Sequence, residues 1–379
     1  MSFLEYRVKF APTGLTKVLY VNWGLYLVIT ACAAIGWLML YSISGGDMGQ
    51  WAGPQMKRFG AGLVLSLMIC LTPIWFWRSM SVAAYVATFA LLLVVQFFGV
   101  IGMGAQRWID IGFMRLQPSE LMKVALVMML ATYYDWLPDR RVSRPLWVLV
   151  PVALILAPAA LVYLEPNLGT TLMLVIAGAG VMFAAGVSLW YFAGVVGVFG
   201  AGVAGIFLLR GTPWQLIHDY QYRRIDTFLD PSADPLGAGY NILQAKIALG
   251  SGGWTGKGFM QGTQSRLNFL PEKHTDFIFT TLGEEFGFIG AISLLTLYAV
   301  ILIFLFWAAL QNKDRFSSLL LIGIAMNFFL YLAVNLAMVM GLAPVVGVPL
   351  PFLSYGGSAT LVLLIAFGLA QSAIVHRLR

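Results

Sequence analysis

The sequence predicts an all-α polytopic integral membrane protein with about ten transmembrane helices and one large loop between the seventh and the eighth. Three observations support this fold class: 60% of the 379 residues are hydrophobic, only 10% are charged, and long apolar runs recur along the chain. Soluble domains contain about 25% charged residues, because their surfaces need polar cover. The composition therefore excludes a soluble enzyme, a disordered regulator and a nucleic-acid-binding domain.

Each predicted span is an apolar run of about 20 residues, the length that crosses the hydrocarbon core as a helix. The polar N-terminal stretch carries no signal-peptide cleavage site, so the first run is expected to span the membrane itself. The small residues of 194–205 indicate close helix packing, and prolines make the boundaries within 145–209 the least distinct. The predicted spans are 19–43, 58–77, 81–104, 118–137, 145–164, 170–187, 189–209, 284–310, 315–341 and 353–376.

If the chain crosses the membrane ten times, its Lys and Arg residues are distributed unequally between the two sides of the membrane. The side with both termini carries eleven of them, and the short loops of the other side carry four. Long loops cross a membrane largely regardless of charge, so residues 210–283 are left out of this count. Because positive charge marks cytoplasmic loops, we expect cytoplasmic termini and an extracytoplasmic loop 210–283 within one membrane domain, 1–379.

The loop 210–283 holds many polar and aromatic residues, and we expect short helices at the membrane surface there. Its glycine-rich piece 250–258 departs from the phosphate-loop pattern G-x-x-x-x-G-K-[ST] at Ser251 and Gly258, which excludes ATP binding. Two interpretations stay open for this piece. Backbone amides and Lys257 contact a phosphate in the membrane, or the piece is a turn-forming linker between two surface helices.

Glu272, His274 and Asp276 stand just before an apolar helix, at the boundary between water and membrane. Low-dielectric surroundings disfavour the charged form of a carboxylate and can tune it as a base. An Asp before a helix can equally cap the backbone amides of the first turn. The pattern alone favours neither role.

The fourth predicted helix opens with the polar sequence 117–123, in which Glu120 and Lys123 share one face. Ionised groups within a span are costly and normally face the bundle interior or a cavity. They form either a structural ion pair or part of a polar pocket near the outer leaflet. Further polar residues are expected nearby: Arg107 and Asp110 of the preceding loop, and Glu165 and Asn167 at the end of another span.

Four motifs in order along the chain carry a resemblance to a known family: Arg107-Trp-Ile-Asp-Ile-Gly112 with Gln117-Pro-Ser-Glu120, Asp230-Pro-Ser-Ala-Asp-Pro-Leu-Gly-Ala-Gly-Tyr-Asn241, His274-Thr-Asp-Phe-Ile-Phe279, and Pro349-Leu-Pro-Phe-Leu-Ser-Tyr-Gly-Gly-Ser358. They resemble the SEDS family, the bacterial peptidoglycan polymerases of shape, elongation, division and sporulation. The pieces 262–265 (GTQS) and 346–349 (VGVP) are closer to the elongation-type (RodA) members than to the division-type (FtsW) members.

The resemblance implies a glycosyltransferase of the bacterial cytoplasmic membrane that works at its outer face during cell elongation. Members polymerise lipid II into β-1,4-linked glycan with inversion and release undecaprenyl pyrophosphate. It also implies that Asp276 is the catalytic carboxylate. One departure is visible at Asn167, where the family often has Asp. The substrate-binding residues that we expect are Arg107, Glu120, Lys123, Lys257, Glu272, His274 and Ser354.

The resemblance further implies a partner, a class B penicillin-binding protein that cross-links the glycan as a heterodimer with the polymerase, within the elongation machinery. We expect no tightly bound cofactor; a divalent cation (Mg²⁺ or Mn²⁺) could assist with the pyrophosphate, although no ligand cluster of recognisable spacing supports a dedicated metal site. Two rival functions fit ten spans with intramembrane charges: a transporter (flippase) of the lipid-linked precursor and a scaffold for the transpeptidase. A neutral isostere at Asp276 separates them, because only the polymerase needs that charge.

Overall fold

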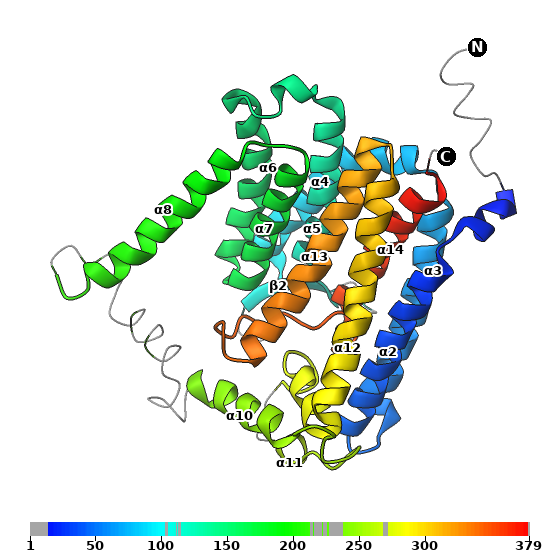
Figure 1. The fold of residues 1–379 in the computed structure, drawn as a ribbon, viewed down its shortest axis with the longest axis vertical. Helices are drawn as coiled ribbons and strands as arrows, with labels where there is room; N and C mark the ends of the chain where they lie inside the picture. The colour runs from blue at the N-terminus through cyan, green and yellow to red at the C-terminus, as the bar shows by residue number, and fades with distance from the viewer. Residues whose placement is uncertain are drawn as a thin grey trace.

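The computed structural model describes residues 14–102, 105–110, 112, 115–212, 215, 222, 226, 238–267 and 272–377. Within these ranges the chain is mostly helical, and each of the ten predicted spans falls on one long helix (Figure 1). The helices are α2 (Trp23–Ile43), α3 (Gly53–Leu71), α4 (Ile74–Phe98), α5 (Pro118–Trp136), α6 (Pro145–Leu164), α7 (Leu168–Ala184), α8 (Leu189–Leu208), α12 (Ile278–Gln311), α13 (Arg315–Val339) and α14 (Gly357–Val375).

The predicted membrane class is confirmed by the length and composition of these helices. Among the described residues, seven helices are long and apolar enough to cross a membrane, and α7 is a shorter apolar helix. The remaining two long helices, α3 and α5, carry charged side chains in their first two turns: Lys57 and Arg58 in α3, and Glu120 and Lys123 in α5.

The described chain begins and ends at the same end of the bundle. Asn22 caps α2, its backbone N–H donates to Gln371 Oε1 near the end of α14 (3.0 Å), and Gln371 Nε2 donates back to Asn22 O (2.9 Å). An even number of crossings is needed to bring these two helix ends together, which agrees with ten spans.

The centre of the bundle is formed by α13 and α14, which have long rows of buried residues. Glycine allows α3 and α14 to come very close: a Cβ at Gly368 would lie 2.7 Å from Ser66 O, and a Cβ at Gly62 would lie 2.5 Å from Leu364. Small residues permit this kind of backbone approach between membrane helices.

Helix α8 contradicts the close packing that its small residues indicate. None of its residues is buried, and it leans away from the other helices (Figure 1). A Cβ at Gly194, Gly197 or Gly200 would meet no other atom within 4 Å. The small residues of 194–205 therefore serve no helix contact in this structure.

The predicted third span, 81–104, is displaced towards the C-terminus, because helix α4 already begins at Ile74, within the predicted second span 58–77. Helix α4 ends at Phe98, and the chain continues into a small antiparallel sheet of β1 (Val100–Gly102), β2 (Ala105–Asp110) and β3 (Arg115–Leu116). Residues 100–104 are as apolar as the helix before them, so composition does not mark the change. The sheet matters for function because it places Arg107.

The loop 210–283 contains the expected short helices where it is described, namely α10 (Ala238–Ser251) and the single turn α11 (Thr263–Arg266). Residues 230–237 of the second motif lie outside the described residues. The helix that follows begins at Ile278, six residues before the predicted start of the eighth span, and has a break at Gly287 (φ 63°, ψ −158°).

The glycine-rich segment 252–258 pairs with the backbone of α12 on both sides of this break. Four backbone hydrogen bonds join the two: Lys257 N to Glu284 O (3.0 Å), Gly258 N to Glu285 O (3.0 Å), Phe288 N to Gly253 O (2.9 Å) and Ile289 N to Trp254 O (3.1 Å). These bonds satisfy backbone N–H and C=O groups of α12 that would pair with each other in an unbroken helix. The segment is thus built into α12 as a linker that follows α10, and it does not form a phosphate cradle.

Candidate active site

A cavity of about 700 Å³ lies at one end of the bundle, where the N-terminal ends of several helices meet. The first two turns of α3, α5, α7 and α14 line it, together with the segment 274–276 that precedes α12. Each helix N-terminus carries a partial positive charge. The convergence of four such ends favours the binding of anionic groups in the cavity. Its lining also carries four Lys and Arg side chains against three carboxylates. The predicted site residues that line it are Arg107, Glu120, Lys123, His274 and Asp276.

Asp276 is held at the wall of this cavity by its own backbone. The fully buried Asn335 donates through Nδ2 to Asp276 O (2.9 Å) and to Val348 O (2.7 Å), which ties the segment to the loop after α13. The carboxylate lies against Gly347, where a Cβ would come within 3.4 Å of Asp276 Oδ2. The side chain is therefore positioned and partly desolvated, while it still faces the cavity.

The electrostatic setting of Asp276 suits a base. Burial, and to a lesser extent the negative charge of Glu272, raise the pKa of Asp276 to about 6. A carboxyl with a pKa near the working pH accepts a proton more readily than an ordinary Asp and is still ionised at neutral pH. Burial also lowers the pKa of His274, whose ring stacks on that of Trp51 with the ring centroids 4.1 Å apart.

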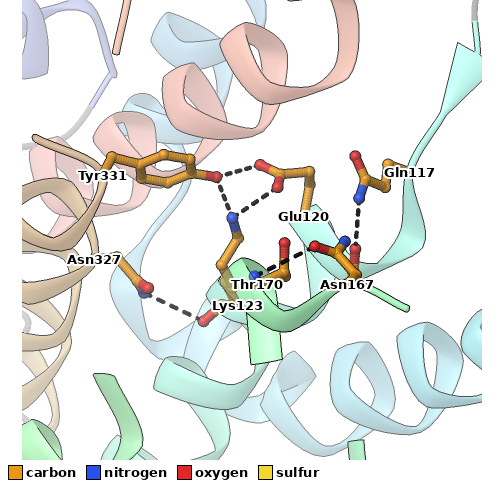
Figure 2. A network of polar contacts seen from close by, with 8 residues as sticks. Gln117, Glu120, Lys123, Asn167, Thr170, Asn327 and Tyr331 are labelled. Carbon is orange, nitrogen blue, oxygen red and sulfur yellow. Dashed lines mark hydrogen bonds and ion pairs between the residues drawn. The ribbon is translucent and has the colours of Figure 1, made fainter. Parts of the chain in front are cut away.

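Glu120 and Lys123 form a buried ion pair with Nζ–Oε1 at 2.7 Å, as Figure 2 shows. Tyr331 of α13 completes a triad: its hydroxyl donates to Glu120 and accepts from Lys123. Glu120 is 4% exposed and Lys123 2% exposed. Because buried charges are tolerated only when they are paired, the triad is a neutral polar group of the cavity wall and not a free cation.

Arg107 reaches from β2 to the end of α6. Its Nε donates to Glu165 O at 2.8 Å, and its Nη2 donates to Pro166 O. Burial raises the pKa of Glu165 to about 7 against the opposing charge of Arg107. Asn167 lines the cavity and caps α7 through Oδ1, which accepts from Thr170 N (3.4 Å; Figure 2). Asn caps a helix as well as Asp does, so the departure from the family pattern leaves this cap intact.

Three of the expected substrate-binding residues lie outside the cavity lining. Lys257 forms an ion pair with the buried Glu284 of α12 (2.8 Å). Glu272 is exposed, and its carboxylate accepts from Thr275. Ser354 is buried, where its Oγ donates to Thr275 O at 2.5 Å. These contacts hold the loops around Asp276 in place, and a direct contact of the three with substrate stays a prediction.

A second group of residues lines the cavity and is not predicted from the sequence. Arg58 lies over the ring of Tyr355, with its Cζ 4.9 Å from the ring centroid, and Trp51 packs on the same ring at 4.8 Å. Arg58 and Arg115, which also line the cavity, are two of the four Lys and Arg that the sequence places on the side opposite the termini. The one available signal for Arg58 was its place in the first two turns of an apolar helix, where a charge needs a reason.

The part of the chain that the structure describes has no evident metal-binding site. No three His, Cys, Asp or Glu side chains there come close enough together to hold a metal ion. The cavity residues therefore do not fit a dedicated cation site.

Comparisons with known proteins show the family of this chain. The family described as cell cycle protein, which includes FtsW, RodA and SpoVE, matches residues 22–378. The chain is 40% identical over 355 residues to the peptidoglycan glycosyltransferase MrdB of Escherichia coli, with 93% of each chain covered, and 36% identical over 308 residues to MrdB of Helicobacter pylori, with 77% and 75% covered.

Two solved structures share the fold. A chain of a peptidoglycan synthase complex that coordinates polymerization and crosslinking superimposes with a TM-score of 0.80 at 29% identity, over 94% of this chain and 97% of the other. The rod shape determining protein RodA of Thermus thermophilus superimposes with a TM-score of 0.71 at 26% identity, over 95% and 98%. Motifs, fold and family match lead to one conclusion: the chain belongs to the FtsW, RodA and SpoVE family, the SEDS family that its motifs resemble.

Proposed function

We propose that this chain is a peptidoglycan glycosyltransferase that polymerises lipid II into β-1,4-linked glycan strands during cell elongation. The observation that carries the proposal is the position of Asp276 at the wall of a cavity on which four helix N-termini converge, where burial raises the pKa of its carboxyl to about 6. Its relatives in Escherichia coli and Helicobacter pylori are named peptidoglycan glycosyltransferases. Such a transfer needs a base that accepts the hydroxyl proton and a surface that binds the anionic leaving group.

In the proposed reaction, the 4-hydroxyl of one lipid-linked sugar attacks the anomeric carbon of another. The carboxylate of Asp276 accepts the hydroxyl proton as the new C–O bond forms with inversion. The bond to the diphosphate breaks at the same carbon, and its electron pair leaves with undecaprenyl pyrophosphate. The leaving group is already a stable anion, so it needs positive potential more than a general acid, and the helix N-termini supply that potential.

The reaction is proposed to take place at the outer face of the bacterial cytoplasmic membrane, with both termini cytoplasmic. Eleven Lys and Arg against four support this orientation. The meeting of Asn22 and Gln371 supports the even number of crossings on which the count depends. Helices α10 and α11 of loop 210–283 lie at the opposite end of the bundle from the described chain ends, which is then the outer one (Figure 1). The cavity is lined by the N-terminal turns of α3, α5, α7 and α14.

A class B penicillin-binding protein is the proposed partner, as a heterodimer within the elongation machinery. The support is the likeness to a chain from a peptidoglycan synthase complex in which polymerization and crosslinking are coordinated. Coupling of the two activities keeps a new strand close to the enzyme that cross-links it.

The test is polymerisation of labelled lipid II by the purified full-length chain together with its cognate transpeptidase. Wild type should give a glycan ladder and Asp276→Asn none, while both bind the partner. Asp139→Asn is the matched control, since it removes an exposed carboxylate outside the cavity. Equal ladders from wild type and Asp276→Asn would contradict the assignment. If wild type gives no ladder where a control polymerase does, the flippase of lipid-linked precursor becomes the better explanation.

A further inference from the structure

We propose that Trp51, held by His274 and Tyr355, is the surface on which the acceptor sugar of lipid II stacks while Asp276 accepts its hydroxyl proton. The inference rests on the proposed function for the identity of the ligand, and it deepens that function by giving the sugar ring a binding surface. All four side chains line the same cavity. The rings of Trp51, His274 and Tyr355 are called the aromatic platform below.

The aromatic platform leaves one face of the indole uncovered by its own members. The ring of His274 stacks on that of Trp51, with the centroids 4.1 Å apart and 19° between the planes. The ring of Tyr355 lies 4.8 Å from the indole at 72°, and 6.1 Å from the ring of His274. These three distances make nearly a right angle at Trp51, so His274 covers a face of the indole and Tyr355 lies beside its edge. Trp51 is half-buried, and we infer that its opposite face is the one that meets the cavity.

The aromatic platform is assembled from three separate segments that are tied together by hydrogen bonds. Trp51 belongs to η2 (Met48–Ala52), the turn before α3, while His274 precedes α12 and Tyr355 precedes α14. The backbone N–H of Tyr355 donates to His274 O (2.9 Å). The guanidinium of Arg58 lies over the ring of Tyr355, with Cζ 4.9 Å from the centroid. A surface that is fixed in this way binds a ligand without having to be ordered first.

A sugar ring is the ligand group that an open indole face in this cavity favours. A pyranose with equatorial substituents directs its C–H bonds to the two faces of the ring and its hydroxyls to the rim. The C–H bonds pack against the electron-rich face of an aromatic ring, and the hydroxyls stay available to polar groups. A diphosphate has no apolar face to offer. A lipid chain has no reason to leave the bilayer for a cavity that is lined by charged side chains.

The position of Asp276 indicates which sugar the aromatic platform binds. His274 and Asp276 are two residues apart, so their Cα atoms lie within about 7 Å of each other. A ring stacked on the aromatic platform therefore has its rim hydroxyls close to the Asp276 carboxylate. Because Asp276 is the proposed base for the attacking 4-hydroxyl, this sugar is the acceptor. Trp108 also lines the cavity, from β2, and the experiment compares the two tryptophans.

The test is binding without turnover, with labelled lipid II and full-length Asp276→Asn chain in detergent micelles. The competitors are a soluble β-1,4-linked N-acetylglucosamine oligomer and undecaprenyl pyrophosphate, which has the lipid and the diphosphate but no sugar. Adding Trp51→Leu should weaken binding of lipid II and of the oligomer about 10-fold and leave binding of undecaprenyl pyrophosphate unchanged. Trp51→Phe keeps an aromatic face and should recover most of the loss. Trp136→Leu is the matched control, because Trp136 is exposed and lies outside the cavity lining.

Three results of this comparison would overturn the proposal. The first is unchanged affinity of Trp51→Leu for lipid II and the oligomer. The second is an equal loss for lipid II and undecaprenyl pyrophosphate, because Trp51 would then hold the shape of the cavity and not a sugar. The third is a loss of oligomer binding in Trp108→Leu but not in Trp51→Leu.

A measurement on the unmodified chain covers the case in which Trp51→Leu does not fold. The oligomer should protect Trp51 from oxidation by hydroxyl radicals, as measured by peptide mass spectrometry, while Trp136 is oxidised at the same rate with and without it. Oxidation of Trp51 that is unaffected by a saturating oligomer would overturn the proposal.

The proposed function and the aromatic platform fail in different ways. If wild type makes no glycan, the proposed function fails, but the binding comparison still decides whether Trp51 holds a sugar. If wild type makes glycan, Asp276→Asn makes none and Trp51→Leu leaves oligomer binding unchanged, the aromatic platform fails and the function stands. When both hold, Trp51→Leu in the active chain should raise KM for lipid II more than it lowers kcat.

Discussion

Acidification should inactivate the enzyme in a way that reports the environment of Asp276. With a pKa of about 6, the carboxyl is about 90% ionised at pH 7 and about 9% at pH 5, so kcat/KM should fall about tenfold between them. An Asp with its ordinary pKa of 3.8 would lose less than about 10% of its ionised form over this range. The assay is the initial rate of glycan formation from labelled lipid II at low substrate concentration from pH 4.5 to 8.

The sign of the stability effect separates this loss from acid unfolding. A carboxyl whose pKa is higher in the folded state than in the unfolded state binds its proton more tightly when folded. Its contribution to stability therefore increases as the pH falls from about 6 towards 3.8. The protein should stay folded at pH 5 as far as this group is concerned, and a thermal unfolding curve at each pH is the control.

A variant of Glu272 tests the second cause of the shift. Glu272→Gln removes the nearby negative charge and should move the acidic limb to lower pH, by less than about one unit because Glu272 is exposed and solvent screens it. A rate that stays flat down to pH 4.5 in the wild type would refute the role of a desolvated Asp276 as the base.

Three further outcomes are expected. Lys123→Met leaves Glu120 buried without its cation and should destabilise the protein by about 3–5 kcal/mol, while the double variant with Glu120→Gln recovers much of the loss; detergent thermal melts measure both. Gly256→Ala places a Cβ 2.1 Å from a backbone carbonyl of α12 and should abolish folded protein on size-exclusion chromatography, whereas Gly253→Ala, which also has a positive φ but meets no atom within 4 Å, should cost about 1–2 kcal/mol. Asn167→Asp should melt within about 0.5 kcal/mol of wild type, because either residue can cap α7; a larger change would show a further role for the position.

Local composition was sufficient to predict the ten spans, since an apolar run of about 20 residues has few other uses. It failed where the physical cause lies elsewhere in the chain. The helix of the eighth span begins at Ile278, six residues before the predicted start at 284, so Glu284 and Glu285 lie inside it. Both are buried there because Lys257 pairs with Glu284 and Ser42 donates a hydrogen bond to Glu285, and these partners come from other segments. The apolar residues of β1 look like more helix, because the pairing with β2 that defines them is not visible in composition.

The candidate active site also combines features that local sequence predicts with features that depend on distant segments. Glu120 and Lys123 are visible as a pair because they are one turn apart, but their third partner, Tyr331, comes from α13. The local sequence pattern is compatible with two roles for Asp276, a base or a helix cap. Only the family resemblance favours the base. Arg58 was missed because its surroundings, Tyr355 and the start of α14, come from the opposite end of the chain.

The backbone pairing between segment 252–258 and the broken helix α12 determines where this protein can accept inserted sequence. Main-chain bonds fix the length of the segment, and its glycines at 252 and 256 leave no room for a Cβ. One added residue would shift the register of the four bonds and displace the start of the helix that follows Asp276. Affinity tags and fluorescent fusions should therefore be placed in the exposed turn 139–141, far from the cavity, and not in this glycine-rich loop.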